Sequence, residues 1–139
     1  MAAHPIHPAV VHFPLGLLLT STAADLAHLA GVWPEPRFAA WLVVWGLAGG
    51  LVAMAAGLID FRRLTDRQVP HALRHMATVA VAWMGYAVAL YLRRDVLAGA
   101  AEPPIASVVV AVLSAAVLAF GGWLGGELVY RYGAGRLLD

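Results

Sequence analysis

The sequence predicts an all-α protein, a four-helix transmembrane bundle in which successive helices run up, down, up and down. Of the 139 residues, 62% are hydrophobic and only 12% are charged, which is about half the charged share of an average soluble domain. The mean hydropathy is +0.79, and the apolar residues gather in four stretches long enough to cross a bilayer. A surface with so few charges has to face lipid.

The four predicted spans cover residues 8–29, 38–59, 71–92 and 105–129. Charged and turn-forming residues gather in the linkers, 31–37, 61–70 and 93–104. Linkers this short make consecutive helices antiparallel neighbours, and lipid offers the backbone no hydrogen-bond partners outside a helix. We therefore expect residues 1–139 to form a single transmembrane domain.

The first span begins without a basic stretch before its apolar run, so we expect no cleaved signal peptide and a helix that stays in the membrane. Pro14 leaves two alternatives open. Inside a helix, it removes the hydrogen bond to the carbonyl of Val10 and kinks the chain. Alternatively, the helix begins near Pro14 and residues 4–12 run extended on the surface.

The arginines predict the orientation of the bundle. We call the membrane face with both termini and linker 61–70 face X, and the opposite face is face Y. Face X carries six arginines: Arg62, Arg63, Arg67, Arg74, Arg131 and Arg136. Face Y carries three: Arg37, Arg93 and Arg94. The positive-inside rule therefore predicts cytoplasmic N- and C-termini in a bacterial inner membrane.

Small residues recur at helical spacing in two spans. The second span holds Gly46, Gly50, Ala53 and Gly57, and the fourth holds Gly121, Gly122, Gly125 and Gly126. Such stripes let transmembrane helices approach closely. They also leave room for a flat cofactor ring, and the sequence does not separate these two interpretations.

Ionisable side chains gather at one end of the predicted bundle. Alternating helix direction brings these residues to face X: His4, His7, His12, Asp60, His71, His75 and Glu127. His12 and His75 lie in the first turns of their helices, where the positive helix end disfavours an imidazolium. A neutral imidazole is the form that binds metals. His12 and His75 are therefore the first candidate ligands, and His7 and His71 are reserves.

Asp60 and Glu127 lie at helix C-termini, where a hydrogen-bond donor has to offset their charge. They are predicted to hold the N–H groups of metal-bound histidines. Three alternatives stay open. The carboxylates pair with nearby arginines, the histidines bind the carboxylates without a metal, or His4 and His7 are solvated tail residues and His71 lies at the water interface. At face Y, Asp25 and His28 form a second polar pair that Arg93 or Arg94 can reach, and we interpret it as structural.

Four segments resemble a known family. They are HPAVVHFP at residues 7–14, GLIDF at 57–61, His75, and GGWLGGELVYRYG at 121–133. Together they resemble the bacterial membrane proteins of domain of unknown function 2231 over nearly the whole chain. The resemblance implies four membrane helices. Relatives joined to c-type cytochrome modules would also imply electron transfer, but the family supplies no catalytic assignment.

The residues support three functions. The first is a b-type haem held by His12 and His75, with electron transfer to a quinone or a membrane redox complex. Covalent haem attachment is excluded because the chain has no cysteine. The second is a non-haem metal site of histidines with Asp60 and Glu127, and the third is a cofactor-free accessory subunit of a larger assembly.

Other function classes find little support. A transporter is the least favoured, since no interrupted helix pair indicates a midplane site. The residues 71–75 have the histidine spacing of a metalloprotease motif but lack its glutamate. No catalytic residue is predicted, and we expect no enzyme activity from this chain on its own. A net charge of +1 gives no reason to expect nucleic-acid binding, so lipids and an oligomer or larger assembly are the expected partners.

Overall fold

The computed structural model of the chain describes residues 6–32, 35–99 and 102–135. These residues form helices and connecting turns and contain no strand. The helices are α1 (His7–Val10), α2 (His12–Leu29), α3 (Pro36–Phe61), α4 (Val69–Leu92), α5 (Arg94–Leu97) and α6 (Ile105–Tyr130). Two residues named above, His4 and Arg136, lie outside the described residues.

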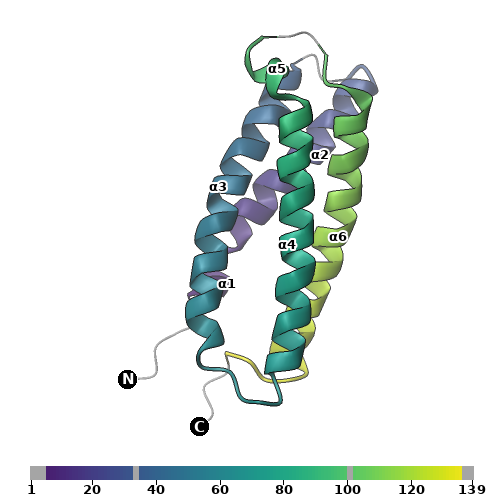
Figure 1. Cartoon of the computed structure of the whole chain (residues 1–139). Coiled ribbons are helices and arrows are strands. Elements are labelled where there is room, and N and C mark those ends of the chain that lie inside the picture. The colour runs from purple at the N-terminus through teal and green to yellow at the C-terminus, as the bar shows by residue number, and fades with distance from the viewer. Residues whose placement is uncertain (1–5, 33–34, 100–101, 136–139) are drawn as a thin grey trace.

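The predicted fold class is confirmed. Four helical segments are long and apolar enough to cross a membrane: His7–Leu29, Pro36–Phe61, Val69–Leu92 and Ile105–Tyr130. They run alternately up and down, and the α3–α4 linker and the end of α6 lie together at the lower end in Figure 1. Only 17% to 33% of the most apolar window of each segment is buried inside the protein. Most of the apolar side chains therefore face outward, as lipid contact requires.

The first span contains a break. α1 and α2 meet at Val11, just upstream of Pro14, which has no N–H to offer the carbonyl of Val10. The chain stays helical on both sides of the break, since the amide of Val11 bonds to His7 and the amide of Leu15 bonds to Val11. Residues 7–12 are therefore helical and not extended. Of the two alternatives, the one with Pro14 inside a helical span describes the structure better.

The bundle consists of two helical hairpins. α2 packs along α3, and α4 packs along α6, more extensively than either hairpin packs on the other. The two hairpins meet through aromatic side chains of α4. The buried hydroxyl of Tyr86 donates to the carbonyl of Leu18 at 3.1 Å and lies 2.8 Å from the hydroxyl of Thr22. The indole N–H of Trp83 donates to the carbonyl of Leu47 at 3.1 Å.

A buried ion pair closes the bundle at face Y. Nη1 of Arg93 lies 2.6 Å from Oδ2 and 2.8 Å from Oδ1 of Asp25. Arg93 lies at the end of α4 and Asp25 lies in α2, so the pair joins the two hairpins. The predicted structural role of Asp25 is confirmed, with Arg93 as its partner. His28, the other member of the predicted pair, lies 2.7 Å from Glu102.

Candidate functional site: a histidine pair at face X

Two imidazoles from different hairpins meet near face X. His7 lies at the start of α1, and His75 lies in the second turn of α4. Their ring centroids are 6.2 Å apart, and the ring planes are inclined at 77°. Both side chains are partly buried. The topology therefore brings together two of the four predicted ligand candidates, from positions 68 residues apart in the sequence.

The two rings are held in the same way, by a backbone carbonyl and a glycine of a neighbouring helix. Nδ1 of His7 lies 2.8 Å from the carbonyl oxygen of Ala53, and Nδ1 of His75 lies 2.9 Å from that of Gly121. A glycine follows each carbonyl residue by four positions. A Cβ at Gly57 would lie 3.2 Å from Nδ1 of His7, and a Cβ at Gly125 would lie 3.0 Å from Cε1 of His75. At these positions glycine is what admits the imidazole.

These contacts set the tautomer of both rings. A carbonyl oxygen only accepts hydrogen bonds, so each Nδ1 has to carry a proton, and in a neutral imidazole Nε2 then keeps its lone pair. Neither Nε2 receives a hydrogen bond within the part of the chain that the structure describes. A histidine with a fixed Nδ1–H and a free Nε2 has the usual arrangement of a metal ligand.

Asp60 fixes the backbone of His7 rather than an imidazole N–H. Its Oδ2 accepts the amide N–H of His7 at 2.9 Å, so the carboxylate sits at the N-terminus of α1, where the helix dipole favours negative charge. The bond ties α1 to the end of α3. Oδ1 of Asp60 is buried and has no hydrogen-bond partner among the described residues.

His12, predicted as a first ligand, lies apart from the histidine pair. It is exposed, and its Nδ1 lies 2.8 Å from the carbonyl oxygen of Pro8 on the preceding turn. His7, predicted as a reserve ligand, is the residue whose ring contacts His75. The ligand roles of both histidines stay predictions.

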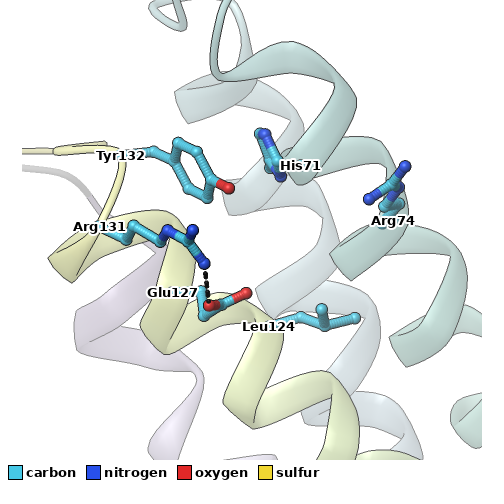
Figure 2. Close-up of a pocket in the computed structure, with 6 residues that line it drawn as sticks. All are labelled: His71, Arg74, Leu124, Glu127, Arg131 and Tyr132. Atoms are coloured by element: carbon cyan, nitrogen blue, oxygen red, sulfur yellow. Dashed lines mark hydrogen bonds and ion pairs between the residues drawn. The ribbon is translucent and has the colours of Figure 1, made fainter.

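His71 and Glu127 belong to a neighbouring feature, which we call the α4–α6 cavity. Its volume is about 200 Å³, and it is lined by His71, Arg74, Leu124, Glu127, Arg131 and Tyr132. The His71 ring stacks on Tyr132, with centroids 3.7 Å apart and an interplanar angle of 19°. Figure 2 shows these side chains around the space between the two helices.

Glu127 forms an ion pair within its own helix. Its Oε1 accepts from Nη1 of Arg131 at 3.1 Å, so the arginine alternative raised for this carboxylate is the one observed. Glu127 therefore pairs with Arg131, whereas Asp60 accepts from the backbone of His7. The two carboxylates have different partners. Among the described residues, no group of three histidine, aspartate or glutamate side chains is arranged to hold a metal ion.

Sequence reasoning placed His7 among the reserve ligands and gave Tyr132 no part in the site. A usable signal exists for the histidine pair. Each imidazole packs on the second member of a small-xxx-small pair, Ala53 with Gly57 and Gly121 with Gly125, and bonds to the carbonyl of the first. A histidine near the start of a neighbouring antiparallel helix lies at the right height for such a pair. For the stacking of Tyr132 on His71, the sequence holds no comparable signal.

Comparison with known proteins identifies one family. Residues 3–137 match the family described as Predicted membrane protein (DUF2231). No curated protein and no solved structure matches the chain.

Proposed function

We propose that this chain, which belongs to the DUF2231 family of membrane proteins, binds b-type haem between His7 and His75 and serves electron transfer. One observation carries the proposal. Two imidazoles from separate hairpins lie in edge contact, each with Nδ1 bonded to a backbone carbonyl and with no hydrogen bond to Nε2 among the described residues. A pair of neutral imidazoles is a common ligand set for haem iron, and bundle interiors often hold such sites.

The ring separation suits two ligands of one metal ion. The ring centroids are 6.2 Å apart, and metal–nitrogen bonds of about 2 Å to each ring would bridge a separation of this size. If haem were bound here, His7 and His75 would hold its iron, each through Nε2.

The surrounding residues suit the proposed role. The carbonyls of Ala53 and Gly121 orient the imidazoles and make them more basic through the Nδ1–H bonds. Exposed arginines at face X, such as Arg62 and Arg67, offer partners for the two carboxylates that haem carries. When bound, haem supplies an iron that accepts and donates single electrons.

An absorption spectrum of the purified protein tests the proposal. Protein made in haem-replete membranes is expected to show a Soret band and an α-band that sharpen on reduction. His7→Gly and His75→Gly should each abolish or shift these bands, and imidazole added to the buffer should partly restore them. Recovery of the bands with added imidazole would show that the variant is folded and lacks only its haem ligand. His12→Gly is the matched control, because this histidine is exposed and points away from the pair.

Three results would reject haem binding through this pair. Unchanged spectra in both glycine variants would show that His7 and His75 are not the haem ligands. A colourless protein with one metal ion per chain would favour the non-haem site instead. A colourless, metal-free protein that purifies with other membrane proteins would favour an accessory subunit.

We also propose that face X is the cytoplasmic side of a bacterial inner membrane. The arginine excess at that face supports this orientation. Because the chain has no cysteine, single cysteines test it directly. A membrane-impermeant thiol reagent added to intact spheroplasts should label Gly99→Cys in the face Y loop and spare Thr65→Cys. The opposite pattern would reverse the orientation.

A further inference from the structure

We propose that the α4–α6 cavity binds the ring of a membrane quinone or quinol. This inference rests on the proposed function, since quinones are small electron carriers that diffuse within the membrane. It names the substrate class with which the histidine pair would exchange electrons.

The cavity lies next to the histidine pair. His71 lies one helical turn before His75 on α4, and a turn advances about 5.4 Å along the axis. On α6, Glu127 lies two residues after Gly125, the residue on which the His75 ring packs. The same two helices therefore hold His75 and, one turn away, line the cavity.

The lining suits a ring with two oxygen substituents. Across the cavity, α4 contributes His71 and the guanidinium of Arg74, and α6 contributes the carboxylate of Glu127 (Figure 2). A quinone carries two carbonyl oxygens on opposite sides of its ring, and a quinol carries two hydroxyl groups there. Arg74 is a donor for one oxygen, and Glu127 is an acceptor for a hydroxyl at the other. Leu124 gives the ring an apolar contact.

The same lining argues against an anion. The arginines alone would suit a phosphate, but Arg131 is already paired with Glu127 at 3.1 Å. The carboxylate of Glu127 also faces the space that a phosphate would fill, and two negative charges in one small cavity repel each other. A neutral ring that both donates and accepts hydrogen bonds does not meet this repulsion.

The size and position of the cavity suit a ring whose tail stays in lipid. About 200 Å³ has room for a substituted six-membered ring, whereas sites that enclose whole drug-sized ligands measure roughly 300–1,000 Å³. Exposed apolar side chains adjoin the lining in sequence. Leu73 precedes Arg74, and Trp123 precedes Leu124. An isoprenoid tail would lie along these lipid-facing side chains.

Photolabelling tests the site without any need for haem. The full chain is placed in nanodiscs of phosphatidylcholine, illuminated with an azido-benzoquinone, and digested for mass spectrometry. We expect label in the segments 69–76 and 121–132, and unlabelled decylubiquinone should suppress it. Glu127→Gln and His71→Gln should each reduce the label at least fivefold. Arg67→Gln is the matched control, because Arg67 is exposed on the same face and lies outside the cavity lining.

Two outcomes would overturn the proposal. One is label spread over lipid-facing residues and unchanged in Glu127→Gln. The other is label that phosphatidylglycerol displaces and decylubiquinone does not, which would assign the cavity to an anionic headgroup. The failures of the two proposals are distinguishable. Competed labelling of a colourless protein would reject haem alone, whereas a haem spectrum without competed labelling would reject the quinone site alone. Gel filtration of each variant shows whether it folds.

Discussion

Two arginine–carboxylate pairs mark the two ends of the bundle, and they differ in almost every physical respect. At face Y, the side chains of Arg93 and Asp25 are 0% and 1% exposed, and the closest N···O distance is 2.6 Å. This pair joins α2 to α4. At face X, the side chains of Arg131 and Glu127 are 69% and 27% exposed, lie 3.1 Å apart and belong to the same helix.

The difference separates a closed end from an open one. At face Y, the pair buries its charges where two hairpins meet, so the charges serve the fold. At face X, polar groups are left available: Nε2 of His7 and His75, the buried Oδ1 of Asp60, and the α4–α6 cavity. Buried polar atoms without a partner among the described residues occur at both ends, since face Y holds Nε and Nη2 of Arg93. The two ends therefore differ in the burial of their ion pairs and in the polar cavity at face X.

Removing the carboxylate at the closed end should have the largest effect on stability. Asp25→Ala leaves the buried guanidinium of Arg93 without its counter-ion, and Nε and Nη2 of Arg93 already have no partner among the described residues. Breaking a buried pair in this way costs about 3–5 kcal/mol. Unfolding in mixed micelles with increasing SDS measures the change.

Two further variants test this interpretation of the closed end. Asp95→Ala is the control, because Asp95 lies on the same face, is exposed and contacts only the exposed Arg94 at 3.8 Å. The double variant Asp25→Leu with Arg93→Met should recover most of the lost stability, since apolar replacement of both partners removes the unpaired charge. A wild-type unfolding midpoint for Asp25→Ala would mean that face Y is not closed by this pair.

A methyl group added under a histidine should disturb the open end by a smaller amount. In Gly125→Ala, the new Cβ would lie 3.0 Å from Cε1 of His75. Such a Cβ contact is tighter than most, so the ring has to shift by a few tenths of an ångström, and overpacking in a packed core costs about 1–3 kcal/mol. The same unfolding assay measures it, and any spectrum that depends on His75 should change with it.

The fourth span supplies a matched control for that substitution. Nothing lies within 4 Å of a Cβ built at Gly126, the next residue along the helix. Gly126→Ala should therefore be neutral or slightly stabilising, because alanine favours a helix by up to about 1 kcal/mol over glycine. Equal effects of the two substitutions would show that His75 does not rest on Gly125.

The sequence predicted the fold because lipid leaves few choices. Long apolar stretches with short charged linkers allow little besides an antiparallel helical bundle, and helix direction follows from counting spans. An arginine partner for Asp25 was also predicted, but the sequence left Arg93 and Arg94 as alternatives, and packing at the end of α4 selects Arg93. α5 was missed because a helix of four residues, Arg94–Leu97, is too short to show a periodic pattern.

The candidate site was harder to predict because a membrane helix is apolar on every side. In a soluble protein, the polar face of a helix tells which residues point inward, but α1 and α2 give no such contrast. His7 and His12 are five residues apart, which places them about 140° apart around a regular helix. Only one can then face α4, and the contacts of His7 with Asp60 and Ala53 of α3, which hold it there, join residues about 50 apart in the sequence.

The smallest effect should come from the exposed pair, and it gives the strictest test of the contrast between the two ends. Arg131→Gln removes a cation whose side chain is 69% exposed and whose carboxylate partner lies four residues away on the same helix. Such pairs contribute about 0–1 kcal/mol because solvent screens the charges. We expect Arg131→Gln to unfold within that range of wild type, several-fold less affected than Asp25→Ala in the same assay. A loss as large as that of Asp25→Ala would mean that Arg131 holds a buried structural contact. Face X would then be a second closed end, and the α4–α6 cavity would lose its standing as an open binding site.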